Sequence, residues 1–487
     1  MRRFSLTVLR NSAFGMAAQL TIKLLSFAFS VLIVRSLGAE AFGQYAAVLA
    51  FTATFAILSD LGLGPYAVRE VARWRDMPDG QQRAAALYGN VLALRFLLSI
   101  LAGGLVIVAA WLTGRPLLMV GAIALNTLGL VLFGVQGASD AMLTGFERLD
   151  ISAGAKVLNQ LVFVLVGAAT LWLGLNYFGL VIANLLGVAL MAYVCWRGVR
   201  ALGVRALRAA AASWPALLRA SLPFGVIGLA LGLSYKFDTV LLNIFRSDAE
   251  TGYYNAAYNL VFSAVLLSNA FNTALYPSLA RQAVSTPQQL PGIYARALRY
   301  LLALSLPIAV GAWALADRLV LFLFEADYLP AVPALQIVIW VVPFMFVSEF
   351  LGYVVVISGR EGRVARAVLV STGLSVALNS LLVPRYGFVA AAVMTVVTEV
   401  VLVVQHVWTL RALMRQINWG SSLLRPAGAA LLMGAVVLLI RSHVPVLVSV
   451  AVGGVTYLGA LLALGVIGKD ELRLFREARF PRAKMES

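Results

Sequence analysis

The sequence has few cysteines, histidines and charged residues. Its single cysteine, Cys195, excludes a disulfide within the chain and a cysteine-based metal cluster. Its two histidines show no metal-ligand spacing, and no Walker motif, glycine-rich phosphate loop or zinc-protease motif is present. Charged residues make up 12% of the 487 residues, about half the share of a soluble domain. These absences argue against a soluble enzyme and predict no catalytic site, no metal site and no cofactor.

Long apolar stretches dominate what is present. The chain is 61% hydrophobic, and about fourteen stretches of ~20 residues are long and apolar enough to cross a bilayer. The basic N-terminus resembles a signal peptide, but the apolar run 12–34 is too long for one and contains Lys23. We therefore predict an all-α integral membrane protein whose first apolar run is retained as a transmembrane helix.

The distribution of Lys and Arg predicts the topology. The net charge of +17 is spread over short loops and forms no basic domain, so nucleic acid is not an expected partner. With the N-terminus in the cytoplasm, every predicted inner segment carries at least two basic residues. No predicted outer loop carries more than one, and the residues concerned are Arg35, Arg115, Arg246, Arg318, Arg385 and Arg441. The positive-inside rule thus places both termini in the cytoplasm.

Residues 34–60 and 245–269 resemble each other. The matched pairs are Arg35 with Arg246, Glu40 with Glu250, Gly43 with Gly252 and Tyr45 with Tyr254. This repeat predicts two pseudo-symmetric six-helix bundles, residues 1–212 and 213–420, related by an axis along the membrane normal. Two further helices and a basic cytoplasmic tail would follow in residues 421–487.

Three basic side chains fall inside predicted spans: Lys23, Arg95 and Lys236. Each would cost about 2.5–3.5 kcal/mol at the centre of a lone helix in lipid, so each needs a partner or a water-filled cavity. Other polar side chains share their helix faces, namely Gln19 and Ser26 with Lys23, Tyr88 with Arg95, and Thr239 and Asn243 with Lys236. These residues predict a cavity for an anion. The alternative is that acids on neighbouring helices neutralise the cations and tie the bundle together.

Acidic side chains also fall within predicted spans. Asp238, Glu349 and Glu399 are candidates to carry a coupling proton or to help bind Na⁺, or they are hydrogen-bonded structural acids. Asp60 closes the second predicted helix near Arg69 and Arg73. We consider Asp60 and Arg69 candidate gating residues, with the shaping of a helix end as the alternative.

Residues 35–45 (RSLGAEAFGQY), 60–63 (DLGL) and 69–73 (REVAR) resemble the start of bacterial polysaccharide-biosynthesis membrane proteins. These are O-antigen-type lipid-linked oligosaccharide flippases of the multidrug/oligosaccharidyl-lipid/polysaccharide exporter superfamily, and the resemblance extends over the whole chain. It implies a transporter of the bacterial cytoplasmic membrane that moves an undecaprenyl-diphosphate-linked oligosaccharide to the outer leaflet by alternating access. It also implies glycosyltransferases and a polymerase of the same pathway as partners, and we expect a monomer. Lys23, Arg95 and Lys236 would then meet the diphosphate.

Three other functions remain open. A multidrug or cation-coupled exporter of the same superfamily usually needs an acidic cavity for cationic drugs, whereas this one is predicted to be basic. A membrane-embedded glycan polymerase or ligase would need a large outer loop, and the predicted outer loops are short. A scaffold for a glycan-assembly complex is the third.

Overall fold

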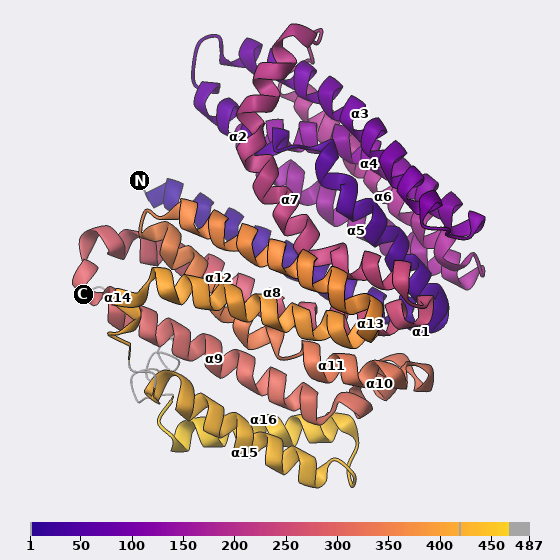
Figure 1. The fold of residues 1–487 in the computed structure, drawn as a ribbon. Coiled ribbons are helices and arrows are strands. Elements are labelled where there is room, and N and C mark those ends of the chain that lie inside the picture. Colours follow the sequence, from indigo (N-terminus) through magenta and orange to yellow (C-terminus); the bar gives the residue numbers. More distant parts are fainter. Residues whose placement is uncertain (1, 418–419, 467–487) are drawn as a thin grey trace. The chain divides into compact units, whose positions relative to one another are not determined.

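The computed structural model describes residues 2–417 and 420–466, although some side chains in these ranges, including Gln19 and Lys23, lie outside the described part. Throughout those ranges the secondary structure is helical, with helices α1 to α16, short 3-10 turns, one π-helical turn and no β-strand. Contacts divide the chain into two compact units (Figure 1). Unit 1 comprises Met1–Leu260 and Val368–Met394, and unit 2 comprises Val261–Ala367 and Thr395–Ser487. The expected division into two related six-helix bundles remains a prediction.

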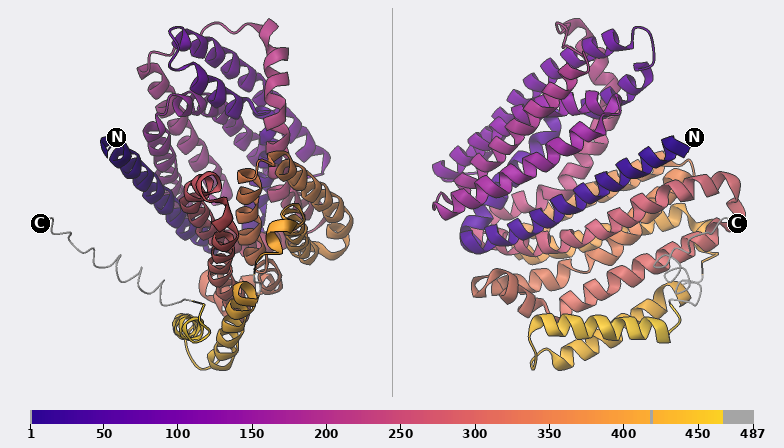
Figure 2. Two further views of the ribbon diagram at one scale, coloured as in Figure 1. Left: turned by 90° about the vertical axis from the view of Figure 1, so that its left-hand side faces the viewer. Right: turned by 180° about the vertical axis from the view of Figure 1, so that it is seen from behind.

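Unit 1 is built around neighbouring long helices. They are α1 (Arg2–Ala56), α2 (Leu63–Trp74), α3 (Gly80–Leu112), α4 (Leu117–Gly145), α5 (Leu149–Trp172), α6 (Asn176–Ala201) and α7 (Trp214–Phe245). Helices α3 to α6 run side by side (Figures 1 and 2), and their core contains the fully buried Met142, Leu143 and Val199. The first part of α8 (Asp248–Ser285) and the middle of α13 (Glu361–Thr409) complete the unit. The α13 segment meets α7 where the Thr372 hydroxyl donates to the Ala230 carbonyl at 3.2 Å.

Two long helices are interrupted by one glycine each. Gly38 in α1 has φ 72° and Gly387 in α13 has φ 60°, both in the region that L-residues with a side chain rarely adopt. The sequence predicts separate spans on either side of each position. The structure joins them through a single non-helical residue, so no loop is needed at either turn.

Unit 2 contains the rest of α8 and α13 and seven further helices. They are α9 (Leu290–Ala314), α10 (Ala316–Phe324), α11 (Val332–Val338), α12 (Val341–Ile357), α14 (Arg411–Met414), α15 (Arg425–Ile440) and α16 (Val446–Ala463). Helices α15 and α16 pack on α9 around Val310, Met433 and Tyr457 (Figure 1). The Tyr457 hydroxyl donates to the Ala303 carbonyl of α9 at 2.7 Å, which anchors the last two helices to unit 2.

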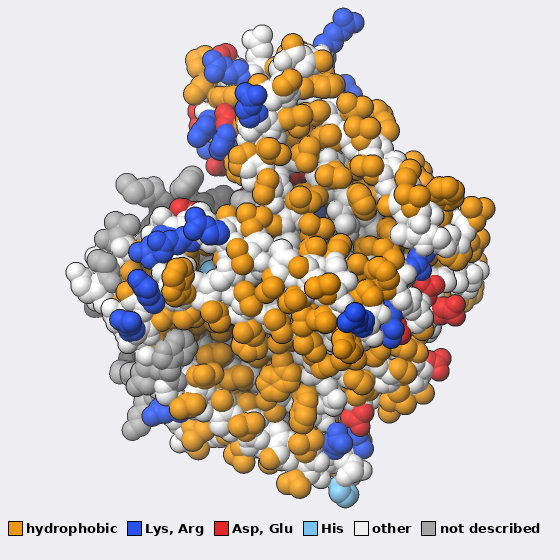
Figure 3. Space-filling model, viewed as in Figure 1, with side chains coloured by type: hydrophobic (Ala, Val, Ile, Leu, Met, Phe, Trp, Pro, Cys, Tyr) orange, Lys and Arg blue, Asp and Glu red, His pale blue; other side chains and the backbone are white. Residues whose placement is uncertain are grey.

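The surface is that of a multi-pass membrane protein. Hydrophobic side chains cover much of the visible face, and Lys and Arg form separate small groups on it (Figure 3). Trp172 and Leu117, for example, are 88% and 83% exposed. Within the described residues, nine helices are long and apolar enough to span a membrane. The number is ten if the bent pair Ala326–Val338 and Val341–Ile357 forms one span. The all-α membrane fold is confirmed, and the count of fourteen spans stays a prediction.

Candidate functional site

Arg95 of α3 has an acidic partner. Its Nη2 lies 2.9 Å from Oδ1 of Asp60, and Arg95 is only 7% exposed. The same carboxylate oxygen accepts the backbone N–H of Gly64 at 3.0 Å, which fixes the start of α2. The Arg95 charge is therefore balanced inside unit 1, and Asp60 pairs with Arg95 rather than with Arg69.

Glycines of α4 make room for this ion pair. A Cβ at Gly137 would lie 2.4 Å from Nη1 of Arg95, and one at Gly134 would lie 3.0 Å from Oγ of Ser99. The Ser99 hydroxyl donates to the Leu130 carbonyl of α4 at 3.1 Å. Helices α3 and α4 can approach closely enough to enclose the guanidinium because those two α4 positions carry no side chain.

A second ion pair lies near the first and was missed by the sequence analysis. Asp140 of α4 lies 3.3 Å from Nζ of Lys156 in α5 and also accepts a hydrogen bond from the Ser152 hydroxyl. Asp140 is close enough to Arg95 to act on its charge. Two acids and two bases thus lie near one another in the interior of unit 1, so the region around Arg95 carries little net charge.

Lys236 of α7 differs from Arg95. Its half-buried ammonium lies 5.5 Å from the centroid of the Tyr258 ring, within cation–π range. In the part of the chain with described side chains, no carboxylate oxygen lies within ion-pair distance of its Nζ. Lys236 is thus a cation without a direct ion-pair partner among those side chains, although the charge of Asp238 acts on it.

Asp238, two residues further along α7, is held by other groups. It accepts the Thr239 backbone N–H at 2.7 Å and the Tyr254 hydroxyl of α8. The Thr239 hydroxyl lies 3.3 Å from Oδ1 of Asn255. Asp238, Thr239 and Tyr254 are all buried, so this network fastens α7 to α8, while the charges of Asp238 and Lys236 act on each other without an ion pair.

Asn243, predicted to line the cavity, instead binds Asp248 at the start of α8. Its amide donates to Oδ1 of Asp248 at 2.7 Å, and Gln44 of α1 donates to Oδ2 at 3.0 Å. Arg115 lies 3.7 Å from the same carboxylate. Asp248 thus joins three separate segments of unit 1.

The remaining predicted site residues have separate surroundings. Tyr88 shares a buried 2.9 Å hydrogen bond with Ser139, and Ser26 is half-buried on α1. Arg69 pairs with Glu70 at 2.9 Å and lies over the Tyr66 and Phe224 rings. Glu349 and Glu399 lie in unit 2, where hydroxyls of Ser268 and Ser348 bind them. The side chains of Gln19 and Lys23 lie outside the described part, so their predicted roles stay predictions.

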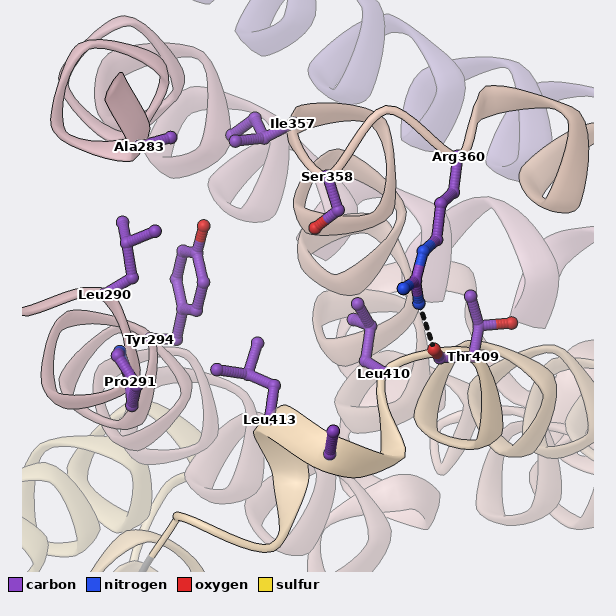
Figure 4. Close-up of a pocket in the computed structure, with 11 residues that line it drawn as sticks. Ala283, Leu290, Pro291, Tyr294, Ile357, Ser358, Arg360, Thr409, Leu410 and Leu413 are labelled. Carbon is purple, nitrogen blue, oxygen red and sulfur yellow. Dashed lines mark hydrogen bonds between the residues drawn. The ribbon is translucent and has the colours of Figure 1, made fainter. Parts of the chain in front are cut away.

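Unit 2 also has a cavity of about 360 Å³ at the ends of α8, α9 and α12 (Figure 4). Its walls are mostly apolar, and Arg360 at its edge donates to the Thr409 carbonyl at 3.0 Å. None of the residues predicted as site residues lines it.

The family of the chain follows from its similarity to known proteins. Residues 8–282 match the family described as "Polysaccharide biosynthesis protein". The chain belongs to this family. It is also 23% identical over 185 residues to the "Probable low-salt glycan biosynthesis flippase Agl15" of Haloferax volcanii. That match covers 38% of this chain and 39% of the relative, so the chain aligns with about two fifths of the relative's length.

Solved transporter structures share the fold. The lipid II flippase MurJ in an inward closed conformation superposes with a TM-score of 0.78 at 12% identity, over 93% of this chain and 99% of that one. An inward-facing MATE multidrug resistance transporter of the MOP superfamily gives 0.63 at 14% identity, over 82% and 98%. The predicted family and the predicted all-α transporter fold are confirmed.

Proposed function

We propose that the protein is a flippase that moves an undecaprenyl-diphosphate-linked oligosaccharide from the cytoplasmic to the outer leaflet for surface polysaccharide biosynthesis. The polysaccharide biosynthesis family and the transporter fold support transport rather than catalysis. One relative is named a glycan biosynthesis flippase and one structural neighbour a lipid II flippase, which supports a lipid-linked glycan as the cargo.

Lys236 carries the proposal. A diphosphate in a membrane cavity needs a cation whose charge is still available, and charge-assisted hydrogen bonds are the strongest that a protein offers it. Arg95 is ion-paired with Asp60, whereas the described contact of the Lys236 ammonium is the face of the Tyr258 ring, and Asp238 acts on its charge without an ion pair. Lys23, at a similar depth in the repeat-related helix, would supply the second charge. Arg95 would then act by holding α3 and α2 in place.

The remaining assignments follow from the same proposal. The protein works in the bacterial cytoplasmic membrane with both termini in the cytoplasm, as a monomer whose two halves alternate access to the cargo. Glycosyltransferases supply the lipid-linked glycan and a polymerase consumes it.

A transport assay tests the proposal. Purified protein is reconstituted in liposomes with an undecaprenyl-diphosphate oligosaccharide that carries a fluorescent sugar. The appearance of the labelled lipid in the opposite leaflet is then measured. Lys236→Gln should slow transport by about tenfold or more, because one charge-assisted hydrogen bond is worth about 1.5–3 kcal/mol. Arg205→Gln removes an exposed charge and serves as the control. Failure of the wild-type protein to move the lipid would refute the function, and normal transport by Lys236→Gln would refute the site.

A multidrug exporter is the second candidate, favoured by the likeness to the MATE transporter fold and by the buried carboxyl of Asp238. Uptake of a cationic dye into the same liposomes separates the two functions. The flippase proposal predicts no dye transport above that of protein-free liposomes.

A further inference from the structure

Two membrane-embedded acids of unit 2 lie in one hydrogen-bonded cluster. Glu349 of α12 accepts the Ser268 hydroxyl of α8 at 2.6 Å and an Asn272 N–H at 3.5 Å. Its neighbour in the chain, Ser348, donates to Glu399 of α13. The cluster therefore connects three helices of one unit, and the charge of Glu349 acts on Glu399.

The cluster has more hydrogen-bond acceptors than donors. Two carboxylates supply four oxygens, and the donors facing them are the hydroxyls of Ser268 and Ser348 and the amide of Asn272. Asn272 is only 2% exposed, and among the described residues its Oδ1 has no hydrogen-bond partner. An excess of buried acceptors is satisfied by adding a proton or a cation.

A buried histidine extends the cluster along α13. His406 is 3% exposed and lies two helical turns from Glu399 on the same face. Its ring packs against Gly352, one turn of α12 beyond Ser348, where a Cβ would lie 3.7 Å from Cε1. Neither ring nitrogen has a hydrogen-bond partner of good geometry among the described residues, and the Ser348 backbone lies close enough to act on the ring. A further group that can take or release a proton thus lies on the α13 face of Glu399, two turns away.

The described surroundings supply no balancing positive charge. Neither carboxyl forms an ion pair with a described Lys or Arg, and no such residue contributes to the electrostatics of either acid. From α9 the neighbouring titratable group is Tyr294, whose ring packs on Phe350, and α12 adds Tyr353 one turn beyond Glu349. Two carboxylates close together in a low-dielectric setting disfavour the doubly ionised state. Both are half-buried, so proton exchange with the outside remains open.

We propose that Glu349, Glu399 and His406, with Ser268, Asn272 and Ser348, form a proton-binding site in unit 2. One proton is shared by the two carboxyls, and the hydroxyls hold whichever of them is ionised. The proton binds as an O–H on a carboxylate and leaves by the same bond to water, with His406, two turns along α13, as a further group that can take it up. The site deepens the proposed transport function, on which it rests, because proton uptake and release would couple transport to a proton gradient.

Infrared spectroscopy of the protein in nanodiscs tests the site without any substrate. Exposed carboxyls are ionised at about pH 7, so a protonated-carboxyl band at that pH reports embedded acids. We expect Glu349→Gln and Glu399→Gln each to lose the band, because removing one negative charge allows the other acid to ionise. Glu361→Gln, which removes an exposed acid at the start of α13, should leave the band unchanged.

Three outcomes would overturn the site. They are the absence of a wild-type band at about pH 7, a band that persists in both Gln variants, and a band that sodium but not choline removes at constant pH. The absence of a wild-type band can be observed without any variant, so this measurement tests the proton site even if a variant fails to fold. In liposomes, an imposed proton gradient should accelerate wild-type transport but not transport by Glu399→Gln. Because the spectra need no cargo, absence of the band from a wild-type protein that still transports would refute the proton site alone. A band without transport would refute the flippase alone.

Discussion

Gly43 and Gly252, equivalent positions of the internal repeat, pack against each other where α1 and α8 meet in unit 1. A Cβ at Gly43 would lie 2.9 Å from the Gly252 nitrogen, and one at Gly252 would lie 3.2 Å from the Gly43 nitrogen. Both would also meet backbone carbonyl oxygens, that of Asp248 at 1.7 Å and that of Ala39 at 2.0 Å. Backbone cannot swing aside as a side chain can, so the contact requires glycine on both helices.

We therefore expect Gly43→Ala to destabilise the protein by about 1–3 kcal/mol, the usual effect of forcing an extra carbon into a packed contact. The thermal unfolding midpoint in detergent is the measurement. Gly121→Ala in α4 is the matched control, because nothing lies within 4 Å of its added Cβ. It should be neutral or slightly stabilising through helix propensity. Equal effects of the two substitutions would contradict the close contact.

The Asp60–Arg95 ion pair predicts that mutations at these two positions have non-additive effects on the stability of the protein. Arg95→Ala leaves a carboxylate without its partner and should cost about 3–5 kcal/mol, whereas the Asp60→Asn, Arg95→Gln double variant should cost clearly less. Arg83→Ala breaks an exposed pair with Asp79 and should cost about 1 kcal/mol or less. Unfolding midpoints of these variants and of the wild type check this, and a double variant as unstable as Arg95→Ala would argue against a coupled pair.

Asp248 should hold α1, α7 and the α3–α4 turn together. Asp248→Ala removes hydrogen bonds to Asn243 and Gln44, and a bond to a charged group contributes about 1.5–3 kcal/mol. We expect a lower unfolding midpoint and little additional loss when Asn243→Ala is added, because both changes remove the same bond. Full additivity in this double-mutant cycle would show that the two side chains act separately.

Cysteine labelling tests the predicted topology. Cys195 is the one cysteine of the chain and is buried, so background labelling should be low. Ser247→Cys, beside Arg246, should react with a membrane-impermeant maleimide on intact cells. Arg205→Cys, between α6 and α7, should react only after the membrane is permeabilised. The reverse pattern would invert the orientation.

The sequence was sufficient for the fold class and the family but not for the partners of individual charges. Apolar run length and loop charge are local properties, and they predicted the helices and the membrane. Helical periodicity predicted which residues share a face with Arg95, but it carries no information about Asp60, which is 35 positions away in the chain. Asp140 and Lys156 were missed for the same reason, since they meet only because α4 packs beside α5.

The internal repeat also shows that sequence patterns do not predict individual contacts. It matched Gly43 with Gly252 as equivalent positions, yet equivalence does not imply contact. It also matched Tyr45 with Tyr254, and only the structure shows that the Tyr254 hydroxyl binds Asp238. For Gly38 and Gly387 the sequence indicated a boundary between spans, but a one-residue turn depends on a φ value that composition does not reveal.

The compensation of Arg95 by Asp60 has an electrical consequence. A neutral pair that moves together through the membrane potential transfers no charge, whereas each uncompensated charge that crosses the whole field exchanges about 2.3 kcal/mol per 100 mV. Rearrangement of α3 with Asp60 would therefore be insensitive to voltage. Movement of the Lys236 ammonium relative to Asp238, whose charge acts on it without an ion pair, would produce a measurable current unless the diphosphate of the cargo travels with it.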